Sequence, residues 1–205
     1  MNVYKIVVLV TLISASVQAE QVTIETKYNP QYFETEKQIA IKSFSKCYSS
    51  YCPVSHLKLS ETYTSQGDNA KKAWLTDTFD EEAADLKNDT EGKITLVKVT
   101  DESGAVIGWA TYEYSDADKH TIYLRQVAVQ VDHQRNGIGT QILDYILKQN
   151  PRANQLSVVV RVINKQAQNF YTKNGFSENK AYVHAGYSTE RYTGYTKTIE
   201  AITKS

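Results

Sequence analysis

The sequence predicts an α/β protein in which a mixed β-sheet is covered by helices. Extended and helical segments follow in the order β-α-α-β-β-β-α-β-α-β-β, and polar turns join the three consecutive strands in the middle. The composition, 41% hydrophobic and 22% charged with only 3 Pro and 9 Gly, is typical of a folded globular protein. Because no repeat or Pro/Gly/Ser-rich linker divides residues 20–205, we expect one domain there.

The first expected elements are one strand and two helices. Residues 22–28 alternate between apolar and polar side chains, as a half-buried strand does. Residues 32–46 and 68–86 repeat apolar side chains at helical spacing. The hydroxyl-rich stretch 48–66 between them is expected to be irregular.

Three strands follow. Residues 93–100 and 106–114 flank a polar turn that ends at Gly104, and Gly tolerates the positive φ that hairpin turns require. The third strand is expected at 120–131, where apolar and polar residues alternate.

The last part of the chain returns to alternating helices and strands. Residues 138–149 carry a wide apolar face, and Pro151 ends this expected helix. Residues 156–163 are almost continuously apolar and predict a buried strand. A short helix is expected at 165–174, ending at Gly175, before two tyrosine-rich terminal strands.

Charge and the amino terminus limit the functional classes. Lys+Arg and Asp+Glu each number 23, and no long basic run is present, which argues against nucleic-acid binding. Residues 1–19 combine Lys5, an apolar stretch too short to span a ~30 Å hydrocarbon layer, and an ending in Val-Gln-Ala. We expect a signal peptide cleaved near Ala19 and export to the periplasm or the medium, with delivery into a host cell as a further destination. No stable membrane insertion is expected after cleavage; the alternative is an uncleaved anchor or a buried first strand.

The two cysteines are Cys47 and Cys52, which lie five residues apart. An oxidising compartment would permit a disulfide, but the sequence does not give the Cα separation on which bonding depends. A disulfide and two free thiols both remain open. No metal site is expected, because neither a second cysteine pair nor a histidine at zinc spacing accompanies them.

A glycine-containing bend connects the third central strand to the helix at 138–149. Residues 134–140 read Gln-Arg-Asn-Gly-Ile-Gly-Thr. The first amides of a helix lack intrahelical acceptors and carry partial positive charge, so this junction can bind a phosphate group, and Gly137 and Gly139 would let the backbone approach it. No Lys-Ser or Lys-Thr follows, which excludes a P-loop, and Ile142 stands where a dinucleotide fingerprint needs Gly or Ala. An ordinary strand-to-helix turn is the alternative.

This bend resembles the acetyl-coenzyme A motif of the GCN5-related N-acetyltransferase (GNAT) family, Gln/Arg-x-x-Gly-x-Gly/Ala after a strand. Gln134, Gly137 and Gly139 stand in the matching places. Residues 164–176, NKQAQNFYTKNGF, resemble the family's Asn-x-x-Ala-x-x-Phe/Leu-Tyr-x-x-x-Gly-Phe segment. The two blocks lie in the expected order, and the match spans about 121–176. It implies the GNAT fold, a mostly antiparallel, splayed central sheet flanked by about four helices.

The resemblance implies acetyl-coenzyme A as co-substrate. Its pantetheine arm would lie in the splayed gap of the sheet against backbone groups of Val129 and Val131, and its pyrophosphate over the amides of 135–140. Asn164 would help to order the cofactor pocket, although an Asn before a helix is also a good N-cap. The residues thus expected to bind the cofactor are Val129, Val131, Gln134, Arg135, Asn136, Gly137, Ile138, Gly139, Thr140, Asn164 and Tyr171.

The same resemblance implies direct attack of an amine on the thioester, with Tyr171 protonating the leaving thiolate and an amide near Val129 meeting the oxyanion. Tyr171 as one more core aromatic is the alternative. Many relatives carry a glutamate base where this chain has Tyr123. Glu113, His120 and a water relay are the remaining candidates for the base, and both side chains could equally be solvated strand residues.

Two functions are therefore expected to compete. The first is an acetyl-coenzyme A-dependent N-acetyltransferase acting on an amine-bearing small molecule or protein. The second is an exported, catalytically impaired protein of the same fold that binds a ligand through tyrosines near its carboxyl terminus: Tyr182, Tyr187, Tyr192 and Tyr195. The glycine bend favours the first function, whereas Tyr123 and the export signal favour the second.

Overall fold

The computed structural model describes residues 23–26, 33–49, 59, 61–65, 69–115, 120–183 and 187–199. The expected signal peptide, Cys52 and the side chain of Cys47 lie outside the described residues. Among the described residues, no helix is both long enough and apolar enough to cross a membrane. No group of three or more metal-ligating side chains occurs among them either.

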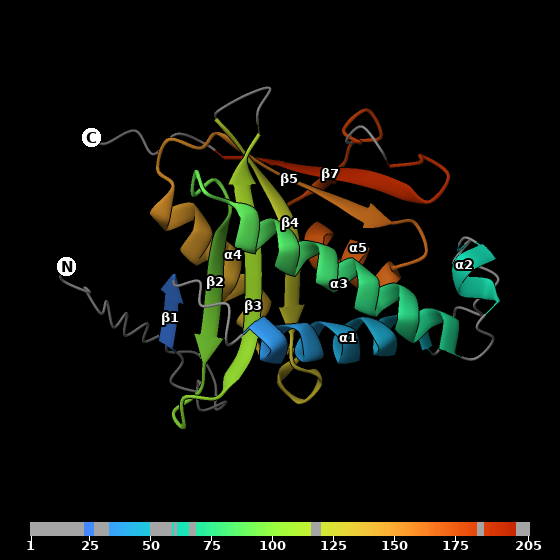
Figure 1. Cartoon of the computed structure of the whole chain (residues 1–205). Coiled ribbons are helices and arrows are strands. Elements are labelled where there is room, and N and C mark those ends of the chain that lie inside the picture. The colour runs from blue at the N-terminus through green and yellow to red at the C-terminus, as the bar shows by residue number, and fades with distance from the viewer. Residues whose placement is uncertain are drawn as a thin grey trace, which may run out of the picture.

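A seven-stranded mixed sheet forms the centre of the molecule, in the order β1-β2-β3-β4-β5-β7-β6 (Figure 1). Neighbouring strands are antiparallel except β4 and β5, which are parallel. This confirms the predicted mixed, mostly antiparallel sheet. The strands are β1 (Thr23–Thr26), β2 (Thr95–Thr100), β3 (Val106–Tyr114), β4 (Thr121–Val129), β5 (Gln155–Arg161), β6 (Ser177–Glu178) and β7 (Tyr192–Thr198).

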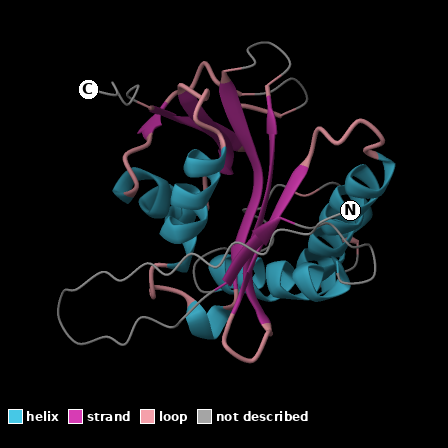
Figure 2. Ribbon diagram, turned by 90° about the vertical axis from the view of Figure 1, so that its left-hand side faces the viewer, coloured by secondary structure: helices cyan, strands magenta, loops and turns pink. Residues whose placement is uncertain are grey.

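Helices cover both faces of the sheet (Figure 2). One core lies under α1 and α3 and contains Phe79 and Trp109; the other lies under α4 and α5 and contains Ile142 and Tyr171. Trp109 and Ala110 are consecutive in β3 and belong to opposite cores, because successive strand residues point to opposite faces. The helices are α1 (Phe33–Ser49), α2 (Glu61–Thr64), α3 (Ala70–Asn88), α4 (Ile138–Gln149) and α5 (Lys165–Lys173).

Three expectations need correction. The single-turn helix α2 lies within the stretch 48–66 that was expected to be irregular. Strand β4 ends at Val129 rather than at 131, and a 3₁₀ helix, Val131–His133, follows it. Of the two expected tyrosine-rich strands, β6 is only Ser177–Glu178 and contains no tyrosine.

Strands β4 and β5 separate part-way along their length, which creates the opening that positions the site. Their parallel register runs from Thr121 opposite Gln155 to Leu124 opposite Val158 and does not continue. A bulge at Arg125 coincides with this point, because the register with β3 shifts there. Figure 1 shows the two strands diverging beyond it, as the family resemblance predicts.

Candidate functional site

The bend before α4 adopts the conformation expected of an anion-binding turn. Gly137 has φ +83° and Arg135 has φ +70°, both in the left-handed region. The first helical hydrogen bond runs from the Gln141 amide to the Gly137 carbonyl at 3.0 Å. The amides of Ile138, Gly139 and Thr140 come before Gln141 in the chain and donate to no backbone carbonyl among the described residues. These amides and the exposed Arg135 can therefore receive an anion at the start of α4.

The two glycines of the bend are required for different reasons. A Cβ on Gly137 would meet nothing closer than the Gln141 side chain at 3.9 Å, so the positive φ is what favours glycine there. A Cβ on Gly139 would lie 2.8 Å from Cε2 of Phe170 on α5. The prediction that both glycines admit an anion is therefore incomplete, because Gly139 also allows α4 to approach α5.

Gln134 connects the bend to its surroundings through its side chain. Its Nε2 donates to the Ser43 hydroxyl of α1 at 2.9 Å and to the Val129 carbonyl at 3.1 Å. Its Oε1 accepts a hydrogen bond from Gln166 of α5 at 3.2 Å. Gln134 therefore fixes the end of β4 relative to the helices on both faces of the sheet, and its contact with the cofactor stays a prediction.

The end of β4 offers an open edge toward β5. The Gln130 amide donates to the Ile107 carbonyl of β3 at 2.8 Å, so the N–H and C=O groups of Val127 and Val129 point to the opposite edge of β4, toward the gap. The Val129 carbonyl already accepts the hydrogen bond from Gln134 there. An extended amide chain could pair with this edge as an added strand. Val131 belongs to the 3₁₀ helix, and its carbonyl accepts a hydrogen bond from the Gln134 amide at 3.4 Å.

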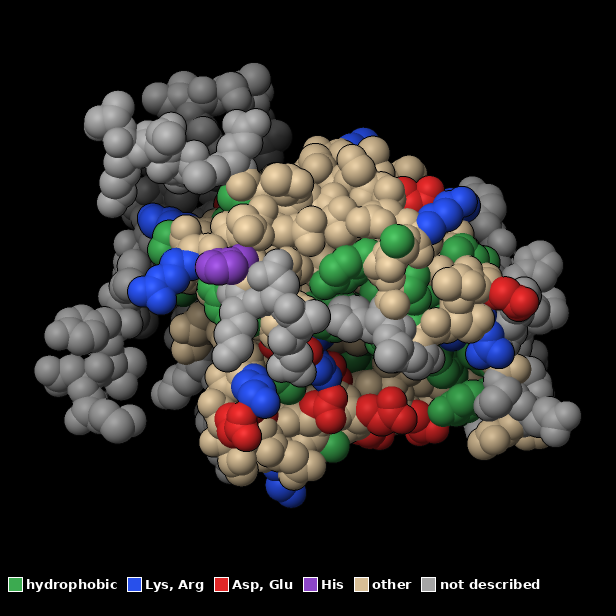
Figure 3. Space-filling model, turned by 90° about the horizontal axis from the view of Figure 1, so that it is seen from above, with side chains coloured by type: hydrophobic (Ala, Val, Ile, Leu, Met, Phe, Trp, Pro, Cys, Tyr) green, Lys and Arg blue, Asp and Glu red, His purple; other side chains and the backbone are tan. Residues whose placement is uncertain are grey.

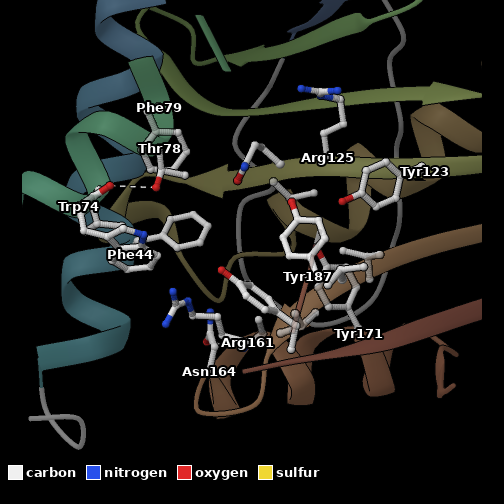
Figure 4. Close-up of a pocket in the computed structure, with 18 residues that line it drawn as sticks. Phe44, Trp74, Thr78, Phe79, Tyr123, Arg125, Arg161, Asn164, Tyr171 and Tyr187 are labelled. Atoms are coloured by element: carbon white, nitrogen blue, oxygen red, sulfur yellow. Dashed lines mark hydrogen bonds between the residues drawn. The ribbon is translucent and has the colours of Figure 1, made fainter. Parts of the chain in front are cut away.

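A cavity of about 140 Å³ occupies the gap between β4 and β5 and extends toward α1 and α3. In Figure 4, Trp74, Thr78 and Phe79 reach it from one side, Arg161 and Asn164 from below, and Tyr123, Tyr171 and Tyr187 from the other side. The aromatic residues that line it are Phe44, Trp74, Phe79, Tyr123, Tyr171, Tyr187 and Tyr192.

Tyr171 is almost fully buried on α5, and it lines the cavity. Its ring packs edge-to-face against Phe170 and Phe176, with centroids 5.0 and 5.2 Å away. Burial raises the pKa of its phenol well above the ordinary value. The phenol has no hydrogen-bond partner among the described residues, so it faces the cavity protonated. The side chain is thus both a core aromatic and a possible proton donor.

Asn164 has the capping role that the sequence left open. Its Oδ1 accepts a hydrogen bond from the Ala167 amide at 3.0 Å, which caps α5. Asn164 also lines the cavity. The helix-cap interpretation is confirmed, and the contribution to cofactor binding stays a prediction.

Tyr123 stands at the position where the family resemblance led us to expect a carboxylate base. Its side chain is buried in the cavity wall, and burial raises the pKa of its phenol far above the ordinary value, with Tyr187 adding to the effect by its charge and its hydrogen bond. Tyr123 is therefore a neutral phenol at physiological pH and does not replace a carboxylate as base.

Arg125 is surrounded by carboxylates. Its Nη2 and Nη1 lie 3.1 Å from Glu82 and 3.1 Å from Glu113, respectively, and it also pairs with Asp85. Burial lowers the pKa of the guanidinium, but the hydrogen bonds and charges of Glu82 and Glu113 outweigh this effect and leave it above its ordinary value. Arg125 therefore serves as the partner of three carboxylates.

The candidate bases lie away from the cavity. Glu113 is held by Arg125 and is not among the described residues that line the cavity. His120 is exposed at the start of β4, with Nδ1 3.3 Å from the Arg152 carbonyl. The structure thus brings the expected acid to the cavity but neither side-chain candidate for the base.

The sequence did not single out Arg161 or Trp74. The Arg161 guanidinium lies 4.2 Å from the ring centroid of Trp74 and 5.0 Å from that of Tyr192. A charged residue inside the mostly apolar segment 156–163 was the available signal for Arg161.

Comparison with known proteins identifies the family. The sequence matches the Acetyltransferase (GNAT) family over residues 58–176, which is more than half of the chain. The chain belongs to this family. Comparison with curated protein sequences gives no match.

Solved structures share the GNAT fold. The PaiA N-acetyltransferase from Thermoplasma acidophilum, in complex with coenzyme A, has a TM-score of 0.63 at 16% identity, covering 87% of this chain and 99% of that one. An acetyltransferase from Thermus thermophilus has a TM-score of 0.60 at 16% identity, covering 86% and 97%. A chimera of the spermidine N-acetyltransferase SpeG from Vibrio cholerae and hSSAT has a TM-score of 0.56 at 14% identity, covering 87% and 94%. Membership of the family makes this GNAT protein an acyltransferase by class.

Proposed function

We propose that this chain is an N-acetyltransferase that moves an acetyl group from acetyl-coenzyme A directly to a primary amine. The observation that supports this most strongly is that the Tyr171 phenol lines the cavity at which β4 and β5 separate. The open edge of β4 leads from this cavity toward the amides of residues 138–140. A pantetheine arm along that edge, with its pyrophosphate at the bend, would bring the thioester sulfur toward Tyr171.

The proposed reaction needs no covalent enzyme intermediate. The amine nitrogen attacks the thioester carbonyl carbon, the C–N bond forms, and the C–S bond breaks with its electron pair on sulfur. Tyr171 gives its proton to this thiolate and regains one that the nitrogen releases, so that the products are an amide and the coenzyme A thiol. An open amide of Val127 or Val129 would stabilise the oxyanion.

We assign removal of the amine proton to water. The carboxylate of Glu113 is held by Arg125, and Tyr123 is a phenol whose pKa is raised. The cavity adjoins the gap in the sheet, and water there could accept the proton as the nitrogen attacks.

Paired tyrosine variants test the function. Tyr171→Phe should lower kcat by roughly 100-fold or more, the usual contribution of a general acid, and leave the affinity for acetyl-coenzyme A unchanged. Tyr112→Phe is the matched control, because both tyrosines are 5% exposed and belong to the same core. Turnover is followed as thiol release, and affinity by calorimetric titration of the full chain.

The outcomes separate the enzyme from a catalytically impaired binding protein. No heat with acetyl-coenzyme A would refute the donor, and equal turnover by Tyr171→Phe and Tyr112→Phe would refute the general acid. Coenzyme binding without transfer to any amine would favour the binding protein, which the phenol at Tyr123 otherwise supports.

We also propose export of the chain by residues 1–19, supported by their hydropathy and small-residue ending. Expression in a bacterium that secretes proteins, followed by mass spectrometry of the amino terminus, should find the chain starting at Glu20 outside the cytoplasm. An unprocessed chain confined to the cytoplasm would refute export.

A further inference from the structure

The bulge at Arg125 shifts the alternation of the peptide groups of β4 by one residue. Ahead of the bulge, the Ser115 amide donates to the Thr121 carbonyl at 2.8 Å, so by alternation the peptide groups of Leu124 point away from β3, toward β5. The next peptide groups with this orientation are those of Val127, three residues further on rather than two. The bulge therefore decides which amides face the gap between β4 and β5.

The side chains of β4 show the same shift. Leu124 belongs to the core under α4 and α5 and Val127 packs against it, although residues three apart in a regular strand point to opposite faces. Ala128 belongs to the core under α1 and α3. Without the bulge at Arg125, Gln126 would take the place of Val127, and the Gln126 amide would face the gap instead.

Glu82 of α3 ties the bulge to β3. Its Oε1 accepts hydrogen bonds from the Thr111 hydroxyl at 2.6 Å and from Arg125 Nε at 3.1 Å, and its Oε2 accepts one from Arg125 Nη2 at 3.1 Å. Thr111 lies opposite the residue that follows the bulge, and the register between β3 and β4 shifts next to it. Nη1 of Arg125 donates at 3.1 Å to Glu113, which lies opposite a residue ahead of the bulge. The guanidinium is thus bound to β3 on both sides of the bulge.

The bulge cluster, formed by Glu82, Arg125 and Thr111, is largely closed to water. Glu82 is 5% exposed and Thr111 is fully buried. A change in one partner therefore leaves the others with an incomplete set of buried hydrogen bonds. Asp85 also pairs with Arg125, but it is half-exposed, on the side of the molecule where acidic side chains gather in Figure 3. Asp85 is therefore the natural comparison for Glu82.

The amide that the bulge turns toward the gap lies beside the proposed general acid. Val127 and Tyr171 both line the cavity between β4 and β5, whereas Val129 is not among the described residues that line it. In the proposed reaction, negative charge develops on the thioester oxygen, next to the sulfur that Tyr171 protonates. A backbone N–H aimed at this oxygen stabilises the charge, and the loss of one such donor lowers kcat about 100- to 1,000-fold.

We propose that Glu82 is a positioning residue for acetyl transfer. It holds the bulge at Arg125, and the bulge places the Val127 amide where the thioester oxyanion forms. Glu82 is not among the described residues that line the cavity, so it acts through the strand. This inference rests on the proposed function, which leaves open whether Val127 or Val129 stabilises the oxyanion.

The test uses the full chain with acetyl-coenzyme A and hydroxylamine, a small nucleophile that is uncharged in neutral solution. Its nitrogen bonds to the acetyl carbon and releases a proton, the C–S bond breaks, and acetohydroxamate and the coenzyme A thiol form. Glu82→Gln should lower kcat at least about tenfold, because glutamine offers one acceptor oxygen to three donors. Asp85→Asn should change kcat less than about twofold, because a half-exposed ion pair contributes little. Free coenzyme A has no acetyl carbonyl, so calorimetric titration should give similar affinities for the parent and both variants.

Two variants of Thr111 separate positioning from stability. Thr111→Val keeps the shape of the side chain and loses the hydroxyl, whereas Thr111→Ser keeps the hydroxyl and loses a buried methyl group. Both should unfold at a lower urea concentration than the parent. At a temperature where circular dichroism shows all proteins folded, Thr111→Val should lower kcat at least about threefold, whereas Thr111→Ser should stay within about twofold of the parent. A merely structural role predicts no such difference between them.

Each outcome decides the inference. Equal kcat in Glu82→Gln and Asp85→Asn, or equal kcat in Thr111→Val and Thr111→Ser, overturns the positioning role and leaves the proposed function standing. A loss of coenzyme A affinity as large as the loss of kcat also overturns it, because the cofactor site itself would then be disturbed. If Glu82→Gln does not fold, the two Thr111 variants decide. A parent chain that does not bind coenzyme A, or binds it without accelerating the acetylation of hydroxylamine, overturns the proposed function itself.

Discussion

Replacing Gly139 by alanine should reverse the usual effect of that substitution in a helix. Alanine is favoured over glycine in a helix by about 1 kcal/mol. At Gly139, however, the new Cβ would lie 2.8 Å from Cε2 and 3.0 Å from Cζ of Phe170. Contacts this short require α4 or the Phe170 ring to move.

The magnitude follows from these opposing effects. Overpacking of a core contact costs about 1–3 kcal/mol, and a contact of 2.8 Å belongs to the upper part of this range, about 2–3 kcal/mol. After a helix gain of about 1 kcal/mol, we expect Gly139→Ala to lose about 1–2 kcal/mol in the free energy of unfolding. The Phe170 ring packs on Tyr171 with centroids 5.0 Å apart. Movement of Phe170 should therefore also displace the Tyr171 phenol and slow turnover.

A double-mutant cycle with Phe170→Leu isolates the contact. Unfolding in urea of the parent, both single variants and the double variant should give a coupling energy of at least about 1 kcal/mol, because the smaller side chain removes the collision. Turnover should recover partly in the double variant relative to Gly139→Ala. The reasoning fails if Gly139→Ala is as stable as the parent while Phe170 is intact.

Three further predictions test the bend, the acid and the charge network. Gly137→Ala should weaken acetyl-coenzyme A binding in calorimetry. The control is Gly104→Ala, which has a nearly identical φ of +82° and similarly open surroundings and should carry the same strain of about 1–2 kcal/mol without affecting binding. Equal affinities of the two variants for acetyl-coenzyme A would contradict this prediction. Burial raises the pKa of the Tyr171 phenol, so its protonated form persists to higher pH. A plot of kcat against pH should therefore show no decrease below about pH 10. A decrease that begins below that pH would exclude Tyr171 as the general acid. Glu82→Gln should lower the free energy of unfolding by about 2–4 kcal/mol, because it breaks a buried ion pair with Arg125. Asp85→Asn should lower it by less than about 1 kcal/mol, because the Asp85 side chain is half-exposed. Equal losses of the two variants in denaturant titrations would refute this ranking.

Local sequence patterns predicted the ends of helices well where one residue close in the sequence sets the end. Pro151 limits α4, and Asn164 caps α5 through a hydrogen bond three residues along the chain. The end of β4 was misplaced because apolar and polar residues continue to alternate through Val131. What ends the strand is the His133 amide, which donates to the Gln130 carbonyl at 2.9 Å and begins the 3₁₀ turn. A period-two pattern does not contain this information.

Contacts between distant segments explain what the sequence did not predict about the site. Arg125 binds Glu82, which lies 43 residues earlier on a different element. Arg161 lies between Trp74 and Tyr192 only because β5 ends where α3 and β7 approach the gap in the sheet. No spacing rule relates these residues, so their roles emerge from the packing of the sheet and its helices.

The phenol at Tyr123 links the mechanism to the choice of acceptor. With water as the base, only the neutral fraction of the amine reacts at an appreciable rate. At pH 7.4 this fraction is about one in a thousand for an amine with a lysine-like pKa of 10.4, and about a quarter for the terminal α-amino group of a peptide, whose pKa is near 7.8. A chain without a carboxylate at Tyr123 is therefore best suited to acceptors of low amine pKa. On the acid side of the pH profile, the rate should rise as the acceptor amine loses its proton. If acceptors with different amine pKa values gave the same pH profile, a base on the protein would be indicated instead.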